Sequence, residues 1–107
     1  YVAYVTCRAE LDELGRVIDF SVIKQRVGEW IDKYWDHGFV LWHIDQEAIS
    51  AVKGVDNQKL YLMKNNPTAE NMAKHLLEVS NRLLDKIEVT KIQLYETENC
   101  YAETTIL

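Results

Sequence analysis

Residues 68–96, TAENMAKHLLEVSNRLLDKIEVTKIQLYE, decide the fold, because the spacing of their apolar residues changes part-way along the stretch. In the first half, apolar residues recur every three or four positions and form one helical stripe, made of Met72, Ala73, Leu76, Leu77, Val79, Leu83 and Leu84. Asn66 or Thr68 is expected to cap this helix, and Pro67 is compatible with its first turn. After Lys86 the spacing becomes two, which predicts a strand.

The predicted strand presents Glu96 on an apolar face. Alternation assigns to that face Thr90, Ile92, Leu94 and Glu96. The opposite face receives Val89, Lys91, Gln93 and Tyr95. Residues 97–99 predict a turn, and residues 100–107 complete a hairpin. Two interpretations of Glu96 stay open: the strand frays and the carboxylate reaches solvent, or it is buried and pairs with an Arg or with two N–H groups of an amidine-like heterocycle.

The residues before this stretch predict a strand, a helix and a short extended segment. Residues 1–9 are rich in Tyr, Val and Thr, as strands are, and ELDELG at 10–15 predicts a turn. A helix is predicted to begin after Ser21 as N-cap, with an apolar face of Ile23, Val27, Trp30, Ile31 and Tyr34. Residues 45–58 predict mostly loop, and KLYLM at 59–63 predicts an extended segment.

This order of elements predicts one α+β domain over residues 1–107. Apolar residues make up 48% and charged residues 27%, as in ordinary globular proteins. The formal charge of −5 argues against a nonspecific nucleic-acid binder, and no apolar run approaches the roughly 18 residues of a membrane span. No signal peptide is visible and the two cysteines form no CxxC motif, so we expect a cytoplasmic protein.

The chain opens in the middle of a strand-like pattern, YVAYVTCRAEL, without a Met. A strand that starts at residue 1 needs a neighbouring strand, and no hairpin partner precedes it. We therefore expect residues upstream of Tyr1, so that the domain lacks its first strand and is N-terminally incomplete in this chain.

Asp36 and His37 are the first candidates for chemistry. A carboxylate beside an imidazole fixes its tautomer and raises its basicity, as a general base requires. The alternative is a helix C-terminus, where a charged His favours the negative end of the dipole, and the pair taken alone favours this alternative.

A second candidate is NPTAEN at 66–71, either an ordinary helix start or a set of exposed backbone groups with Glu70 in the first turn.

The remaining His, Cys and Trp residues favour structural roles. His43 and His75 lie in different segments without partners at ligand spacing, so neither is predicted to bind a metal. Cys7 and Cys100 fit small strand positions better than nucleophiles. The three Trp residues fit a core or a subunit contact, namely Trp30, Trp35 and Trp42.

Four motifs together resemble the 6-pyruvoyl-tetrahydropterin synthase and 6-carboxytetrahydropterin synthase family, in the family's order. They are ELDELGRVIDF (10–20), DHGFVL (36–41), NPTAEN (66–71) and LYETENCYAE (94–103). The resemblance implies the tunnelling fold, an antiparallel sheet with two helices on one face. It also implies a homohexamer, a dimer of trimers with active sites between subunits, which would cover the edges of a small sheet.

The resemblance also implies roles for individual residues. Asp36 and His37 match the family's Asp-His pair, which works with a cysteine in proton transfer. Glu96 matches the glutamate that anchors the pterin ring. Thr68 and Ala69 match positions whose backbone holds the pterin, and Glu70 supports them. The family's zinc is bound by three histidines, two in an HGHN motif, and these and its catalytic cysteine are expected upstream of Tyr1, so no metal ligand is predicted in this chain and Cys7 is not that cysteine.

The last motif is more similar to the bacterial 6-carboxytetrahydropterin synthases of queuosine biosynthesis. This implies a zinc-dependent lyase that converts 7,8-dihydroneopterin triphosphate to 6-carboxytetrahydropterin, acetaldehyde and triphosphate. Lys24, Arg26 and Lys64 are available for the triphosphate, and the sequence does not choose among them. The alternatives are 6-pyruvoyl-tetrahydropterin synthase activity, a pterin-binding or structural homologue without turnover, and an unrelated α+β interaction module.

Overall fold

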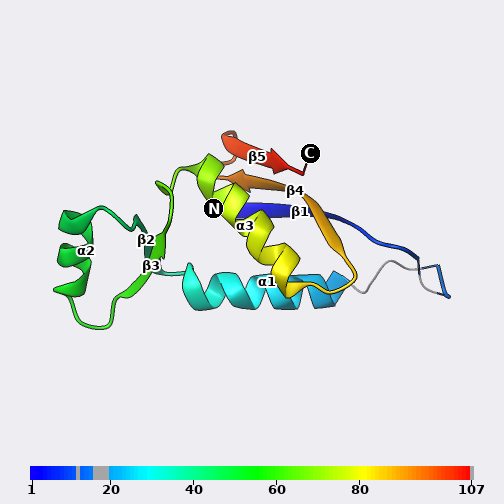
Figure 1. Cartoon of the computed structure of the whole chain (residues 1–107), viewed down its shortest axis with the longest axis horizontal. Coiled ribbons are helices and arrows are strands. Elements are labelled where there is room, and N and C mark those ends of the chain that lie inside the picture. Colours follow the sequence, from blue (N-terminus) through cyan, green and yellow to red (C-terminus); the bar gives the residue numbers. More distant parts are fainter. Residues whose placement is uncertain (12, 16–19, 107) are drawn as a thin grey trace.

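The computed structural model describes residues 1–11, 13–15 and 20–106, and its elements form two sheets and three helices. In chain order they are β1 (Val2–Arg8), α1 (Phe20–Tyr34), β2 (Gly38–Trp42), α2 (Gln46–Lys53), β3 (Lys59–Met63), α3 (Ala69–Leu83), β4 (Glu88–Tyr95) and β5 (Tyr101–Thr105). The described residues form an antiparallel sheet in the order β1-β4-β5 and a parallel pair β2-β3 (Figure 1). The α+β prediction with an antiparallel sheet is confirmed. Asp12 and residues 16–19 of the first motif, and Leu107, lie outside the described residues.

The core lies between α3 and the antiparallel sheet, and the helix and strand predicted for residues 68–96 supply most of its buried residues. Leu76 on α3 and Ile92 on β4 are both fully buried, and Val27 of α1 belongs to the same cluster. Alternate residues of β1 pack against this cluster on the same side, namely Ala3, Val5 and Cys7. Both long helices therefore cover one face of the sheet, as the family resemblance implies.

The side chain of Asn81 fixes the turn from α3 into β4. Its Nδ2 donates to the carbonyl oxygens of Leu77, at 3.2 Å, and Val89, at 3.1 Å. Its Oδ1 accepts from the Val89 N–H at 2.8 Å. One amide thus satisfies two backbone groups of a strand end and ties that strand to the helix.

A β-bulge changes which residues of β4 face the core. Thr6 of β1 pairs with Lys91, whereas the next residue, Cys7, pairs with Val89, so Thr90 is the extra residue. Simple alternation assigned Val89 to the face opposite Ile92, and this was wrong, because Val89 is fully buried. A bulge inserts one residue and resets the alternation on either side of it. Thr90 donates its hydroxyl to the Thr6 carbonyl at 3.2 Å.

Two further predictions, one for residues 45–58 and one for Ser21, were also wrong. Residues 45–58 were expected to be mostly loop, but they contain α2, whose N-cap Asp45 accepts from the Ala48 N–H at 3.2 Å. This helix connects β2 to β3, which is why the two strands run parallel. Ser21 is not an N-cap, because α1 already includes Phe20. Thr68 is the N-cap of α3, as predicted.

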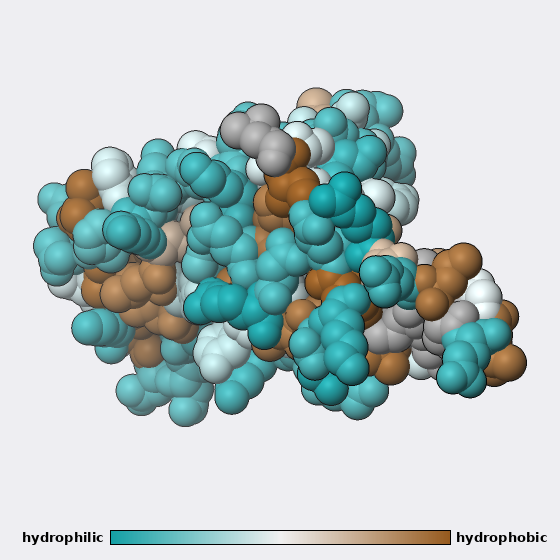
Figure 2. Space-filling model, turned by 45° about the vertical axis from the view of Figure 1, so that its right-hand side comes forward, coloured by the Kyte–Doolittle hydropathy of each residue, from teal (hydrophilic) through white to brown (hydrophobic). Residues whose placement is uncertain are grey.

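The face of the molecule shown in Figure 2 is mostly hydrophilic, with apolar side chains in separate patches. The sheet face that α1 and α3 do not cover exposes a row of aromatic rings across its three strands. Tyr4 and Tyr95 meet edge to face at 5.5 Å between centroids, and Tyr95 stacks on Tyr101 at 4.6 Å. Within the described ranges, no helix is both long enough and apolar enough to cross a lipid bilayer.

Candidate pterin-binding site

Asp36 and His37 lie in the turn between α1 and β2. The N–H groups of Trp35 and Asp36 both donate to the Ile31 carbonyl at 2.8 Å, and the Gly38 N–H donates to the Trp35 carbonyl at 3.0 Å. His37 adopts a φ of 56°, in the left-handed region that few residues other than glycine enter. These bonds end the helix and turn the chain directly into the strand.

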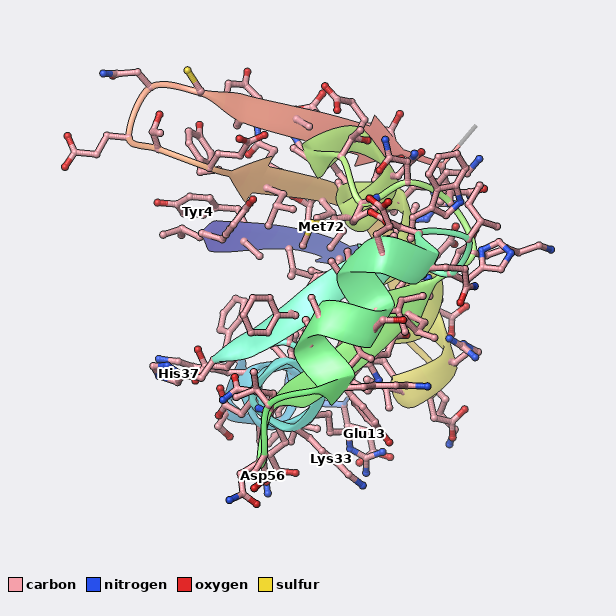
Figure 3. All side chains as sticks on the ribbon, turned by 90° about the vertical axis from the view of Figure 1, so that its left-hand side faces the viewer. Tyr4, Glu13, Lys33, His37, Asp56 and Met72 are labelled. Atoms are coloured by element: carbon pink, nitrogen blue, oxygen red, sulfur yellow. The ribbon has the colours of Figure 1, made fainter. Side chains whose placement is uncertain are left out.

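The two side chains of this turn are close but not hydrogen-bonded. His37 Nε2 lies 3.6 Å from Asp36 Oδ2, which is an ion-pair distance. The His37 side chain is 92% exposed and that of Asp36 54% exposed. His37 projects outward, whereas Met72 points into the interior (Figure 3). The pair is therefore accessible to a ligand.

A groove of about 480 Å³ runs beside this pair, within the usual size range of small-molecule sites. Asp36, His37 and Gly38 line one side of it. Parts of β1, α1, β2, α3 and β4 and the segments next to them supply the rest, including Tyr1, Ala3, Trp35, Pro67, Met72 and Leu94. The groove thus joins two of the sequence motifs, DHGFVL and NPTAEN.

The start of α3 is held by capping bonds. The Asn71 N–H donates to Thr68 Oγ1 at 3.2 Å, and Asn71 Nδ2 donates to the Asn66 carbonyl at 2.8 Å. Ala69 is buried and Glu70 is exposed in the first turn, where a carboxylate complements the helix dipole. Pro67 lines the groove, but the Thr68, Ala69 and Glu70 side chains do not. These three residues follow the groove-lining Pro67 in the sequence, but their side chains do not line the groove.

Glu96 follows the last residue of β4. Its N–H donates to the Cys100 carbonyl at 2.9 Å, and Thr97 Oγ1 accepts from the Cys100 N–H at 3.1 Å, so the β4–β5 turn holds its backbone. The Glu96 side chain is exposed. In this single chain the strand ends before Glu96 and the carboxylate reaches solvent, so the burial interpretation is wrong here.

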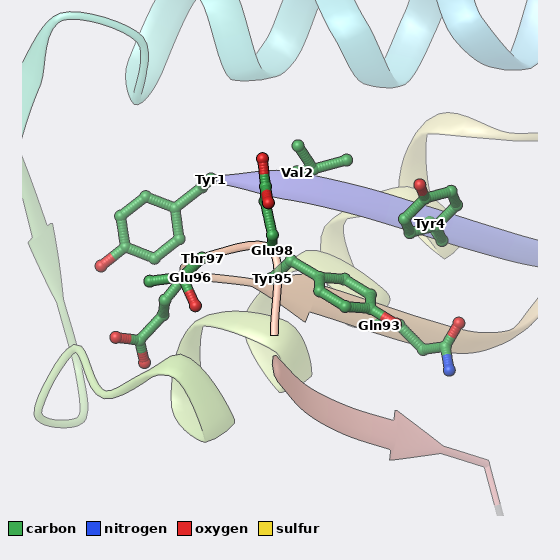
Figure 4. A pocket seen from close by; sticks show the side chains of 8 residues that line it. All are labelled: Tyr1, Val2, Tyr4, Gln93, Tyr95, Glu96, Thr97 and Glu98. Atoms are coloured by element: carbon green, nitrogen blue, oxygen red, sulfur yellow. The ribbon is translucent and has the colours of Figure 1, made fainter. Parts of the chain in front are cut away.

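Glu96 lines a second pocket, of about 610 Å³, on the uncovered side of the sheet. Figure 4 shows its members, which are Tyr1, Val2, Tyr4, Gln93, Tyr95, Glu96, Thr97 and Glu98. Tyr1 lines this pocket and also the groove beside Asp36 and His37. The groove and the second pocket therefore adjoin at the start of β1. The groove and Glu96 lie at the same end of the sheet.

The described residues do not fit a zinc site. Among them, no three His, Cys, Asp or Glu side chains are grouped closely enough to hold a metal ion. Cys7 is partly buried in β1, and burial raises the pKa of its thiol, which opposes formation of a thiolate. The structure thus gives Cys7 no character of an activated nucleophile.

His75 takes part in an aromatic cluster that was not predicted from the sequence. Tyr61 Oη and His75 Nε2 are hydrogen-bonded at 2.6 Å, and the Trp35 ring stacks on the imidazole at 6.2 Å between centroids. Burial is the main cause that lowers the pKa of His75. Alternation along KLYLM places Tyr61 and Met63 on the same face of the strand. This alternation was the sequence pattern from which an inward-facing Tyr61 could have been predicted. Trp35 connects this cluster to the Asp36-His37 turn.

Comparison with known proteins decides the family. The family model for 6-pyruvoyl tetrahydropterin synthase matches residues 1–106. The chain belongs to the 6-pyruvoyl tetrahydropterin synthase family. Its relatives include proteins named 6-carboxy-5,6,7,8-tetrahydropterin synthase from Rickettsia bellii, 43% identical, and Rickettsia typhi, 42% identical; each match covers 96% of this chain and 78% of the relative. A protein of the same name from Helicobacter pylori is 26% identical, over 88% of this chain and 51% of its own length.

Proposed function

We propose that this protein is a 6-carboxy-5,6,7,8-tetrahydropterin synthase, a lyase-type enzyme that acts on 7,8-dihydroneopterin triphosphate. The products would be 6-carboxytetrahydropterin, acetaldehyde and triphosphate. The observation that carries the proposal is the 43% identity to a protein of that name over 96% of the chain. The groove beside Asp36 and His37 supports it, because a pterin-sized ligand can reach both side chains there.

In this proposal His37 transfers protons to and from the substrate side chain. A general acid–base group must reach the reacting atoms, and the exposed imidazole at the groove edge meets that requirement. Asp36 orients the imidazole, and the 3.6 Å separation closes to a hydrogen bond when the substrate fixes the turn. The Glu96 carboxylate accepts hydrogen bonds from the N–H groups of the pterin ring. The backbone of Thr68 and Ala69, supported by Glu70, holds the ring from the other side.

Zinc remains a prediction of the family resemblance. The described residues do not supply a set of ligands for it, so the roles proposed above involve no metal ion. Elemental analysis of the purified full-length protein measures zinc directly and separates this question from that of pterin binding.

We propose in addition that copies of this chain associate through their antiparallel sheets. The support is the exposed aromatic face, on which Tyr1, Val2, Tyr4 and Tyr101 are 75%, 55%, 58% and 51% exposed. Burial of that face by a second copy would also enclose the pocket that contains Glu96 and remove its carboxylate from water. The hexamer, the cytoplasmic location and the queuosine pathway remain predictions.

Product identification tests the activity. The full-length protein is incubated with 7,8-dihydroneopterin triphosphate, and pterins and acetaldehyde are identified by mass spectrometry. The proposal expects 6-carboxytetrahydropterin, and it expects Asp36→Asn and His37→Gln each to lower the rate by about 100-fold or more. His43→Gln is the matched control, because His43 is exposed outside the groove, and its rate should equal that of the wild type.

Each other outcome selects an alternative. A 6-pyruvoyl product would identify the sibling activity that gives the family its name. Pterin binding without turnover would indicate a non-catalytic homologue. Neither binding nor turnover would refute the proposal, and the unrelated interaction module is already excluded by the family match over residues 1–106.

A further inference from the structure

Lys59 contacts the backbone of the turn that carries Asp36 and His37. Its Nζ donates to the Asp32 carbonyl oxygen at 2.7 Å and also to the Asp36 carbonyl oxygen. Carbonyl groups at a helix C-terminus have no partner within the helix, and a cation near them is favoured by the dipole. One ammonium group thus joins the last turn of α1 to the residue just before His37.

The end of α1 is open to this contact because its hydrogen bonding is shifted. The Asp36 N–H donates to Ile31, five residues back, and not to Asp32, four residues back. This π-type turn leaves the Asp32 carbonyl free for Lys59. A hydrogen bond of this span is a common way for an α-helix to end.

The fold delivers Lys59 to this position through the parallel pair of strands. Lys59 is the first residue of β3 and pairs in register with Gly38, the first residue of β2. A side chain at position 38 would collide with it, because a Cβ there would lie 2.8 Å from Lys59 Cδ and 3.0 Å from Cγ. Gly38 therefore provides the space through which the lysine stem reaches Asp32 and Asp36.

The contact with Asp36 bears on the conformation of His37. The Asp36 carbonyl belongs to the peptide group between the two residues, so fixing that oxygen restricts ψ of Asp36 and φ of His37 together. His37 has a φ of 56°, in the left-handed region that is unfavourable for an L-residue. A cation bound to that peptide opposes relaxation of the turn and thereby holds the direction of the imidazole.

We propose that Lys59 is a positioning residue for the Asp36-His37 pair and that Gly38 is required to admit it. The inference rests on the proposed function of that pair. Lys59 acts through the backbone of the turn and contacts no substrate. Its removal should therefore affect turnover more than substrate binding.

Steady-state kinetics of the full-length enzyme test this inference. In Lys59→Met, kcat should fall about 10- to 100-fold while KM changes by less than about 3-fold, because misorientation of a reacting group costs rate and not affinity. Lys59→Arg keeps a cationic donor and should recover at least part of the rate. Gly38→Ala keeps the lysine but displaces its stem, and it should lower kcat in the same way.

Lys53→Met is the matched control. Lys53 lies in the last turn of α2 and is exposed, so this variant removes one charge from a helix C-terminus without touching the Asp36-His37 turn. It should keep the wild-type kcat. Circular dichroism verifies the fold of every variant, and if Lys59→Met does not fold, Gly38→Ala and Lys59→Arg decide the question.

Two results would overturn the inference: wild-type kcat in Lys59→Met or Gly38→Ala, or an equal loss in Lys53→Met. Failure of the synthase function is distinguished by a measurement without turnover. The ¹H–¹⁵N resonances of Asp36, His37 and Gly38 should shift in Lys59→Met and not in Lys53→Met. If these resonances shift in a protein that makes no product, the proposed function is refuted, but the effect of Lys59 on the conformation of the turn is established.

Discussion

The α3–β4 core and the groove rim place their residues by different means. We call the rim the residues Asp36, His37, Thr68–Glu70 and Glu96. In the core, Leu76 and Ile92 are fully buried, and their positions follow from apolar spacing. On the rim, His37 is 92% exposed, so burial does not fix it. Hydrogen bonds of turns and caps to the backbone hold the rim instead. Substitutions in the core should therefore cost stability, and substitutions on the rim should cost function.

Ile92→Ala should give the largest loss of stability. Truncating a fully buried side chain leaves a cavity, and the free energy of unfolding should fall by about 2–5 kcal/mol. Ile44→Ala makes the same chemical change at a position that is 54% exposed, and it should cost less than about 0.5 kcal/mol. Urea denaturation measures both. Equal losses in the two variants would contradict the location of the core.

Asn81→Ala should be intermediate, because it leaves backbone groups at the start of β4 without a partner. The Val89 N–H donates to Asn81 at 2.8 Å, and Val89 is fully buried. Loss of these bonds should lower the free energy of unfolding by about 1–3 kcal/mol. Asn65→Ala, at an exposed position, serves as control in the same denaturation experiment. An Asn81→Ala chain as stable as the control would show that the amide is dispensable.

The pH dependence of stability should report His75, which borders both regions through Trp35. Burial lowers the pKa of His75 in the folded state below its ordinary 6.5. Below pH 6.5 the unfolded chain therefore binds more protons at this residue than the folded chain does. The free energy of unfolding should fall as the pH decreases from about 7 through that range. His75→Gln should reduce this slope, as urea titrations at several pH values would reveal.

Glu96→Gln should have the smallest effect on stability and a large effect on ligand binding. The carboxylate is exposed, so the free energy of unfolding should change by less than about 0.5 kcal/mol. Pterin affinity should fall at least 10-fold, because a charged acceptor is lost, and isothermal titration calorimetry measures it. Glu98→Gln is the control in the same turn and pocket. If Glu96→Gln binds as the wild type does, Glu96 is not the pterin anchor.

The sequence predicts the core well because its signals are local. The stripe from Met72 to Leu84 specifies α3, and Thr68 at its start is a recognisable cap. The bulge at Thr90 was not predictable from alternation, since it depends on how β1 pairs with β4. The same holds for β2 and β3, whose parallel pairing requires α2 as a crossover. Only Ile49 of α2 is buried, so its sequence carries a weak apolar pattern.

The rim was predicted only through the resemblance to a family. The Asp36-His37 pair taken alone favoured an ordinary helix end, and its geometry is indeed that of a helix end. Its neighbours give it a site: Tyr1 and Pro67 line the same groove although they are far away in the sequence. Lys59 was not predicted, because its contact with Asp36 depends on strand register.

An NMR titration tests most directly whether the rim is a pterin site. ¹⁵N-labelled full-length protein is titrated with neopterin, and the shifts of the backbone amide resonances are mapped on the structure. We predict saturable shifts concentrated at Asp36, His37, residues 68–70 and Glu96, with little change along α2. Shifts confined to other surfaces, or none at millimolar neopterin, would contradict a pterin site at this rim.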